Sequence, residues 1–513
     1  MRMRITTGMA MNTYRYNLQK STQNRDDSMN KVLSHRKFDS FAEDPASAIQ
    51  AWRIRRSMVN TACYSKNNQD TLTRFDIAYA TMAAVTHELT DLDGRSADIY
   101  AANDPTASGR NELGKVLSET AESVIHAMNG AKSGSDFVFA GDDELNAPFT
   151  WNADRTILYY RGVNVNAGSV KSPAEAPEWA PKDANGKAVE NTNDAALAEA
   201  FRDSIPTETE ADMEWAAYYK DPTVTTKPTS QAPDWVPKDA NGDPIGKTEQ
   251  ELAKAYKDSL PAKDSAEYAQ LSSAEKAWVN YYKDDPAGSP RPDTEPAWAT
   301  AAAKDDFDVP VGSSAMLDDP KASELDKAWA EYYLDQGDVK QLQKMSEEEA
   351  PIDLGMGLLR DDDGNLIPGT YYSRALPGIN MLGFGIDKDG DPKNVCMIMK
   401  QLGEIYSRCD KDTGRYASDQ DYKDAMRLMN KLKDAQGAAS GKYVDIGAEA
   451  SFLKQNQERL DLQVNYLNEQ RASIEDVDLA DAIQQFSWDY YCYSAALKVG
   501  TQLLSQSLID YMS

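Results

Sequence analysis

Two long lines of apolar residues run through the C-terminal part of the chain and predict long helices. In the final line, apolar residues recur at steps of three, four or seven positions. This spacing places them on one face of a helix and indicates a helix–helix seam. The predicted stripe consists of Leu479, Ile483, Phe486, Tyr490, Tyr493, Leu497, Leu504, Leu508 and Tyr511.

A second line lies just upstream and has the strict seven-residue spacing of a coiled coil. Together the two lines cover roughly 65 residues, and at about 1.5 Å per residue they would extend about 100 Å, beyond the diameter of a compact domain. We therefore expect much of this seam to meet another long helix, from this chain or from a neighbouring copy. The upstream line consists of Ile446, Leu453, Leu460, Leu467 and Ile474.

The first 130 residues also read as helices. Asp44-Pro45 and Asp104-Pro105 each place a capping acid before a proline suited to the first helical turn. In the N-terminal arm, polar sequence at 21–26 interrupts the apolar seam, so we expect this arm to fray alone and to be ordered by packing. Its candidate seam consists of Met11, Tyr14, Leu18, Met29 and Val32.

The pattern changes near residue 131, where "SDFVFAGDDELNAPFTW" and "ILYYRG" read as short strands and turns. Similar sequence returns after residue 350, and helical sequence resumes near residue 394. The predicted fold class is mainly α, with long terminal helices forming a helical-bundle rod and a β-rich middle layer. The expected parts are terminal arms at 1–40 and 475–513, a helical rod at 41–130 and 394–474, a β-rich domain at 131–171 and 336–393, and an insert at 172–335.

The insert contains a repeat that occurs three times. "APEWAPKDANGKAV" at 176–189 matches "APDWVPKDANGDPI" at 232–245, and "WAAYYKD", "WVNYYKD" and "WAEYYLD" recur further on. We expect each copy to be a small module held by two tryptophans and a Tyr-Tyr pair. The opening tryptophans are Trp179, Trp235 and Trp298, and the closing ones are Trp215, Trp278 and Trp329.

Charge changes this picture in two ways. The chain of 513 residues carries a formal net charge of −28, of which the insert contributes −18, and such a surface disfavours nucleic acid and anionic membranes. Residues 1–60 carry a net charge of +6, whereas residues 441–513 carry −6. The two ends of the chain are therefore expected to attract one another.

The sequence gives little sign of targeting to a membrane. No apolar run approaches the roughly 18 residues of a membrane span. The start "MRMRITTGMAMNTYRYN" has no apolar block long enough for a secretory signal. Any export is expected to use another route.

Candidate chemistry is sparse. The cysteines never form a C-x-x-C pair, and the histidines have no accompanying nucleophile motif, so we expect no catalytic residue, no cofactor and no metal site. The acid-rich loops at 361–365 and 387–391 lack the glycine and glutamate of a helix-loop-helix calcium site. The cysteines are Cys63, Cys396, Cys409 and Cys492, and the histidines are His35, His87 and His126.

Three stretches of sequence resemble the family of bacterial flagellar hook–filament junction proteins, the third hook-associated proteins. "GSDFVFAGDDELNAPF" at 134–149 is similar to the family's hinge segment, and "MRMRIT" with "EDPASAIQAWRIRR" at 43–56 to its opening. The end of the chain, "RASIEDVDLADAIQQFSWDYYCYSAALKVGTQLLSQSLIDYM", is similar to the C-terminal helix shared with flagellin. The insert lies outside this resemblance. The hinge residues it implies are Phe137, Phe139, Gly141, Pro148 and Phe149.

The resemblance implies a flagellin-like, extracellular structural subunit without catalysis. Its terminal helices would form an inner coiled-coil layer and assemble into a closed ring of about eleven copies. The implied partners are further copies of this chain, the preceding hook-associated protein, flagellin, and a flagellar export chaperone before secretion without a cleaved signal. The arms would be poorly ordered in the free subunit and would fold on assembly.

Two other interpretations remain open. The chain could be flagellin itself, which shares the terminal helices, although the "MRMRIT" opening, the hinge segment and the ending "SLIDYMS" favour the junction protein. Alternatively, the insert could act as a surface adhesive module whose aromatic residues stack on sugars, although core packing is the commoner role of such residues. An enzyme in the insert is disfavoured because residues 172–335 contain neither His nor Cys.

Overall fold

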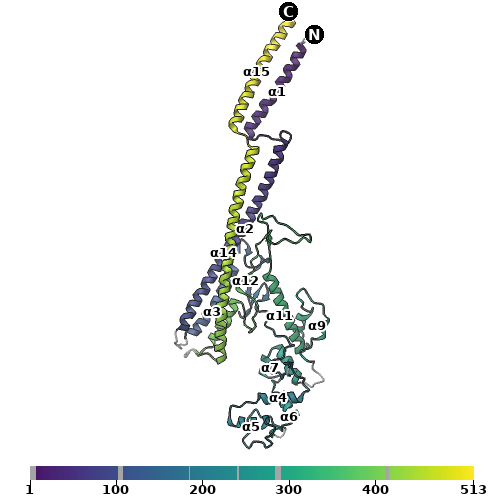
Figure 1. The fold of residues 1–513 in the computed structure, drawn as a ribbon, viewed down its shortest axis with the longest axis vertical. Helices are drawn as coiled ribbons and strands as arrows, with labels where there is room; N and C mark the ends of the chain where they lie inside the picture. The colour runs from purple at the N-terminus through teal and green to yellow at the C-terminus, as the bar shows by residue number, and fades with distance from the viewer. Residues whose placement is uncertain are drawn as a thin grey trace. The chain divides into compact units, whose positions relative to one another are not determined.

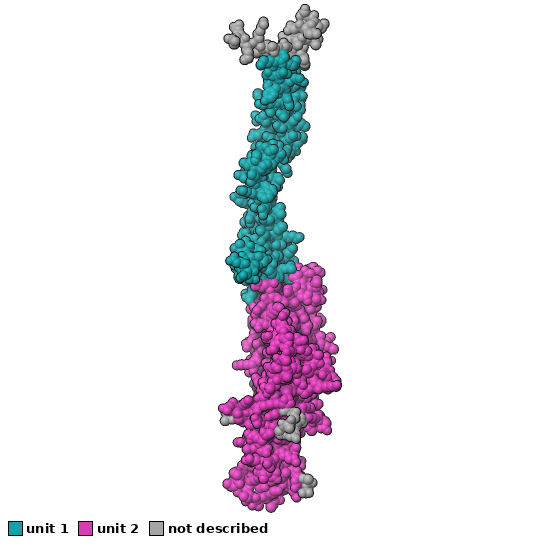
Figure 2. All heavy atoms as spheres, turned by 90° about the vertical axis from the view of Figure 1, so that its right-hand side faces the viewer, with its two compact units in different colours: residues 1–79, 350–374, 444–513 teal, residues 80–349, 375–443 magenta. Residues whose placement is uncertain are grey.

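The computed structural model describes residues 7–101, 108–183, 185–239, 242–283, 290–410 and 415–512. The prediction of a mainly helical protein is confirmed, since helices make up most of the ordered elements. The chain divides into two compact units (Figure 2). Unit 1 comprises residues 1–79, 350–374 and 444–513, and unit 2 comprises residues 80–349 and 375–443.

In unit 1 the first and last helices of the chain lie side by side and run in opposite directions (Figure 1). Helix α1 spans Thr7–Ser34 and helix α15 spans Leu479–Met512. Helix α1 continues without a break through the polar stretch at 21–26. Packing against α15 stabilises the helical conformation of this stretch, whose own sequence provides few apolar contacts.

The same unit contains the start of α2 (Pro45–Ala101) and the end of α14 (Asp419–Glu475). Helix α2 begins at the predicted Asp44-Pro45 step, where Asp44 Oδ1 accepts a hydrogen bond from Ser47 N at 3.1 Å. The second predicted step, Asp104-Pro105, lies outside the described residues.

The connections α1–α2 and α14–α15 are joined to one another. Lys37 N donates to Glu475 O at 2.7 Å, and Val477 N donates to His35 O at 3.1 Å. The carboxylate of Glu475 is buried and accepts from Arg55 Nη2 at 2.7 Å. The base of the α1/α15 pair is therefore fixed by backbone pairing and by one ion pair.

The helical part of unit 2 is built around α3 (Ser108–Gly130) and α13 (Val395–Ser407). Helix α13 begins at Asn394, whose side chain accepts hydrogen bonds from the backbone of Cys396 and Met397. The two helices approach closely at Gly114 and Gly403. A Cβ placed on Gly403 would lie 2.7 Å from the carbonyl oxygen of Gly114, so neither position has room for a side chain.

The expected β-rich layer contains much less strand than the sequence pattern predicted. Its strands are two or three residues long, and the rest consists of turns. Frequent Asp-Gly and Pro steps limit each strand because they impose turns every few residues. The strands of unit 2 are β1 (Lys132–Ser133), β2 (Asp136–Phe137), β3 (Phe149–Trp151), β4 (Leu158–Tyr160) and β5 (Val163–Asn164), and those of unit 1 are β6 (Pro351–Ile352) and β7 (Tyr372–Ser373).

These strands pair into three small antiparallel sheets. In the largest, β4 lies between β3 and β5, and Phe149 is opposite Tyr160 in the register. Strand β1 pairs with β2, and β6 pairs with β7. A four-residue helix, α12 (Ile379–Leu382), follows in unit 2.

One tight hairpin recurs five times along the chain. In each copy an aspartate N–H donates to the carbonyl oxygen four residues later at 2.8 to 3.0 Å, and the fourth residue has a positive φ. In the last copy the ammonium group of Lys431 lies 2.6 Å from Asp387 and 3.0 Å from Asp389, so a cation of the protein itself occupies this acidic loop. The hairpins span 183–187, 239–243, 305–309, 361–365 and 387–391.

The insert is a set of short helices that belong to unit 2. Three of them, α5, α8 and α11, carry the closing tryptophans and begin with a Ser or Thr followed three residues later by an acid. The insert helices are α4 (Asp194–Ser204), α5 (Glu210–Lys220), α6 (Glu249–Ser259), α7 (Ala266–Gln270), α8 (Ser273–Lys283), α9 (Ala297–Ala301), α10 (Ser313–Asp318) and α11 (Glu324–Ser346).

The first two copies of the repeat are intertwined, so each of these modules is held in part by the aromatic residues of the other copy. The opening Trp179 of copy 1 packs against Tyr282 of α8, which closes copy 2, with ring centroids 6.2 Å apart. The opening Trp235 of copy 2 packs against Tyr219 of α5, which closes copy 1, at 6.3 Å. One apolar core therefore serves both copies.

The third copy has a small core of its own tryptophans, which also includes Ala277 of α8 from the second copy. Its opening Trp298 packs in a separate small core with Trp329 and Tyr333 of its own closing helix α11. The indole Nε1 of Trp298 donates to Asp326 at the start of the same helix at 2.8 Å.

Asp335 in α11 fixes the two ends of the insert to one another. Its buried carboxylate accepts from Gly168 N at 2.9 Å and from Val170 N at 3.1 Å. One turn further on, burial and the nearby charge of Asp335 raise the pKa of Asp338 to about 6. At the point where the two ends of the insert meet, the carboxylate of Asp335 is therefore fully hydrogen-bonded, whereas that of Asp338 is costly to ionise.

We expect Asp338→Asn to stabilise the protein at neutral pH. An acid with a raised pKa binds its proton more tightly in the folded state, so its ionisation opposes folding above pH 6 and this cost disappears as the pH falls towards 3.8. Because Asp338 is only half-buried, the gain in the free energy of unfolding should be about 1 kcal/mol at pH 7.5. Urea unfolding at pH 7.5 and pH 4 measures it, and an equal gain at both pH values would contradict the assignment.

Candidate subunit interface on the terminal helices

Helix α15 packs against α1 through a line of alternating small and aromatic residues. Ala482 and Gly500 are buried, and Phe486, Tyr493 and Ala496 are half-buried. A Cβ on Gly500 would collide with the hydroxyl group of Tyr14, so this glycine allows the close approach of the two helices. The spacing of these positions alternates between three and four residues after Asp489 is included, which is typical of a coiled coil.

Helix α1 contributes a matching line at the same intervals. Of the predicted seam, Met11, Tyr14, Leu18 and Val32 are half-buried, whereas Met29 is 44 % exposed. The line is completed by polar residues that the apolar pattern could not identify. These are Ser21, Arg25 and Ser28.

Arg25 gives this polar segment a specific contact. Its guanidinium group lies 4.3 Å from the ring centroid of Tyr493, which is a cation–π geometry, and its Nη2 forms an ion pair with Asp26 at 2.5 Å. A planar cation on an aromatic face provides favourable contacts where no apolar side chain is available. The seam of α1 and α15 therefore continues through the polar stretch.

Four other apolar residues of the predicted stripe remain exposed on α15 beside this seam. We name Leu479, Ile483, Tyr490 and Leu497 the outer stripe; they are 40 %, 47 %, 56 % and 41 % exposed. Phe486 and Tyr493 lie on the α1 side, as described above. The predicted stripe is thus divided between an internal seam and an exposed one.

The remaining members of the stripe, Leu504, Leu508 and Tyr511, have side chains that lie outside the described part of the structure. Helix α15 itself continues past them to Met512.

The upstream line of seven-residue spacing lies inside unit 1. Ile446, Leu453, Leu460 and Leu467 are buried, and Ile474 is half-buried.

Buried amides accompany this line. Asn68 Nδ2 donates to Leu453 O at 2.9 Å, and Asn456 Nδ2 donates to Asn68 Oδ1 at 2.8 Å. A buried amide pair of this kind fixes the register of α2 and α14, because a shifted register would leave these groups unpaired.

The residues of the implied hinge gather in unit 2. Phe139, Gly141, Pro148 and Phe149 are buried, and Phe137 is half-buried. The Phe149 and Tyr160 rings lie 5.1 Å apart.

Residues distant in sequence complete this cluster. Tyr160 donates its hydroxyl proton to Phe139 O at 3.0 Å, and Arg161 Nη1 lies 2.6 Å from a carboxylate oxygen of Glu348. Gly378 N also donates to Phe139 O at 2.8 Å. No local pattern in the sequence connects Arg161 with Glu348, so sequence reasoning missed this ion pair.

Other kinds of site have little support in the described residues. No helix there is both long and apolar enough to cross a membrane. Within the same described ranges, no group of three or more His, Cys, Asp or Glu side chains is arranged to hold a metal ion.

The outer stripe is one of several exposed apolar features of unit 1, which also include Trp488 and Tyr491 of α15. Comparison with known proteins adds no assignment to it: no protein-family model matches this chain, and no curated protein matches it significantly.

Proposed function

We propose that the protein is a structural subunit of the bacterial flagellum that forms the junction ring between hook and filament and performs no catalysis. The observation that carries the proposal is the outer stripe, which lies on α15, one of the two antiparallel helices formed by the ends of the chain. Paired terminal helices with uncovered apolar residues suit a subunit whose arms pack against copies of themselves. The resemblance of the opening, the hinge segment and the last helix to the junction family supports the same function.

The energetics of the outer stripe favour association. Four large apolar side chains that are about half exposed would each gain about 1 kcal/mol on complete burial, and a ring provides every copy with the same neighbour. Because the gain is repeated at each contact, modest pairwise affinity suffices for a stable ring.

The proposed partners are further copies of this chain in a ring of about eleven, the preceding hook-associated protein on the hook side, and flagellin on the other. The proposed location is extracellular, after export through the flagellar apparatus with the help of a chaperone. The charge of −28 supports a solvated outer surface and disfavours nucleic acid as a partner.

Deleting the gene tests the proposal and separates it from the alternative that the chain is flagellin. Loss of a junction protein should stop swimming and release unpolymerised flagellin into the medium. Loss of a flagellin should instead leave short, capped hooks and no flagellin in the medium. The second outcome, or normal swimming, would refute the junction function.

We also expect the insert to be dispensable for assembly. Removing residues 172–333 and joining the ends with a short Gly-Ser linker retains Asp335, which already holds Gly168 and Val170. The outer stripe belongs to unit 1 and is not changed by this deletion. Swimming of the deletion strain measures the effect, and a non-motile strain with normal secretion of the shortened protein would contradict the expectation.

A further inference from the structure

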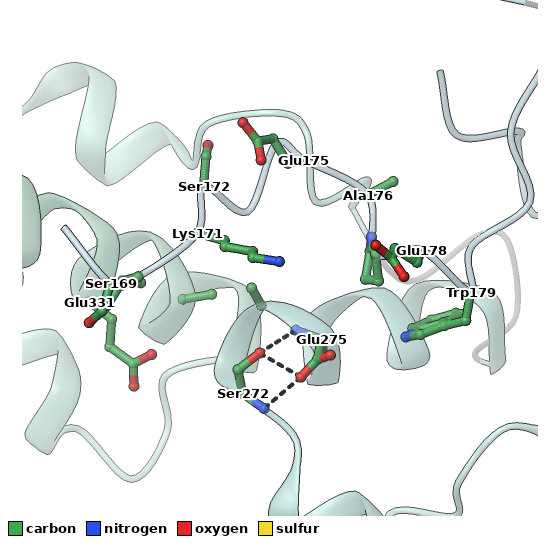
Figure 3. Close-up of a pocket in the computed structure, with 14 residues that line it drawn as sticks. Ser169, Lys171, Ser172, Glu175, Ala176, Glu178, Trp179, Ser272, Glu275 and Glu331 are labelled. Carbon is green, nitrogen blue, oxygen red and sulfur yellow. Dashed lines mark hydrogen bonds between the residues drawn. The ribbon is translucent and has the colours of Figure 1, made fainter. Parts of the chain in front are cut away.

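The insert contains a cavity of about 940 Å³ in unit 2. Its lining includes Trp179, Lys171, Glu175, Glu178, Glu275 and Glu331 (Figure 3). A volume of this size suits a small ligand rather than a single water molecule. An aromatic ring together with several polar groups is a common composition for such a site.

The three copies of the repeat provide an internal comparison for this cavity. In the pair formed by Trp235 and α5, the indole Nε1 donates to Asp212 Oδ1 at 2.7 Å, while the other oxygen of Asp212 accepts from Thr209 in the helix cap. In the third copy, Trp298 and Asp326 repeat this arrangement, with Ser323 in the cap. In both places the acid closes the gap between the helix start and the tryptophan.

The equivalent pair at the cavity is Trp179 and Glu275, but these two side chains do not form a hydrogen bond with each other. Glu275 Oε2 accepts from Ser272 N at 3.0 Å and from Ser272 Oγ at 2.9 Å, as in the other caps. Neither Glu275 Oε1 nor Trp179 Nε1 has a hydrogen-bond partner among the described residues. In Figure 3 the indole nitrogen faces the side of the cavity on which Glu275 lies.

The donors and acceptors around the cavity indicate which ligand would fit. Trp179 Nε1 and the ammonium of Lys171 are donors only, whereas the carboxylates are acceptors only. An amine could satisfy the carboxylates but would leave the half-buried indole N–H of Trp179 unpaired, and an anion would be repelled by the excess of carboxylates. A hydroxyl group can accept a hydrogen bond from the indole or the ammonium group and at the same time donate one to a carboxylate.

We infer that this cavity binds a neutral sugar, whose hydroxyl groups bridge Trp179 and Lys171 to the carboxylates of Glu275 and its neighbours. The exposed part of the indole provides an apolar surface for the C–H face of the sugar ring. This inference does not depend on the proposed assembly, because the cavity belongs to unit 2 and the outer stripe to unit 1. It gives the insert a role in surface recognition.

The test uses the full-length protein on an array of oligosaccharides, followed by calorimetry with the neutral oligosaccharide that binds best. Trp179→Phe keeps an aromatic ring but removes the N–H donor and part of the stacking face, and should weaken binding by at least about tenfold, which is the effect of one lost hydrogen bond. Glu275→Asp introduces the shorter acid of the other two copies, which should bond directly to the indole and weaken binding at least as much. Asp326→Glu makes the opposite change at the third copy and should leave binding unchanged.

Circular dichroism and thermal unfolding establish whether each variant is folded. If Glu275→Asp does not fold, the affinity of Trp179→Phe for the sugar alone tests the inference. Absence of binding at millimolar neutral sugar would overturn the inference. So would binding of charged sugars only, or an affinity that both cavity variants leave unchanged.

Discussion

The combined variant Ile483→Gln, Tyr490→Gln and Leu497→Gln should be secreted as a folded subunit but should fail to assemble. All three residues are exposed in the single chain, so their replacement removes little internal packing beyond the contact of the Tyr490 ring with Phe486, and glutamine is a good helix former. The free energy of unfolding should change by less than about 0.5 kcal/mol. A loss of about 1 kcal/mol at each of three positions would weaken every contact between copies by about 150-fold.

The measurement is complementation of a deletion strain, with swimming and flagellin in the medium as readouts. A control variant carries Gln484→Ala and Lys498→Gln, each one residue after a position of the outer stripe. The strain that carries it should swim normally. Normal swimming of the triple variant would contradict the assignment of the outer stripe. Thermal unfolding of the secreted variant shows whether a failure to swim reflects lost assembly or lost folding.

The replacement Gly403→Val should be the most damaging single change to the stability of unit 2. A Cβ at this position would lie 2.7 Å from the Gly114 carbonyl oxygen and 2.8 Å from Ser118 Oγ. The backbone of α3 cannot move aside without disturbing the core residues packed between α3 and α13. We expect the free energy of unfolding to fall by about 3 kcal/mol, which is a large part of the stability of an ordinary domain.

Two glycines of α14 provide the control for this variant. Gly437 and Gly441 have no atom within 4 Å of an added Cβ. Gly437→Ala and Gly441→Ala should each raise the free energy of unfolding by up to about 1 kcal/mol, because alanine favours the helix more than glycine does. Urea unfolding compares all three variants. Equal stability of Gly403→Val and the wild-type protein would refute the close α3–α13 contact.

The sequence predicted those features that depend on periodicity. Seven-residue spacing coincides with buried positions at Leu453 and Leu460, because one face of a long helix meets the same partner at every second turn. Periodicity was less informative on α15, where it selected the large residues. It identified Phe486 and Tyr493 on the α1 side but missed Ala482 and Gly500, whose small side chains permit the close approach to α1.

Features that depend on pairing between distant segments could not be predicted. The sequence of the repeat does not indicate that Trp179 packs on the closing helix of the second copy, whereas Trp298 packs on the closing helix of its own copy. The partners are chosen by chain connection and core shape, which no local pattern encodes. The same holds for Lys431, which fills an acidic loop about 40 residues before it in the sequence.

The terminal arms connect the fold with the proposed function. Helices α1 and α15 are joined at their base by Glu475 and its backbone partners, and their contact further out uses small and polar residues such as Ser21, Arg25 and Gly500. An isolated helix pair with so few large buried side chains is only marginally stable in water. Neighbouring copies that cover the outer stripe would supply the missing apolar burial.

Amide hydrogen exchange along residues 7–34 and 479–502 tests this account most directly, comparing the dilute single chain with flagellar hooks isolated together with their filaments. We expect protection in the single chain to be high near Lys37 and Glu475 and to decrease towards the ends of both helices. In the assembled form, slow exchange should extend along both helices. Full protection of both arms in the dilute chain, with no gain on assembly, would contradict the claim that copies of the protein complete its terminal helices.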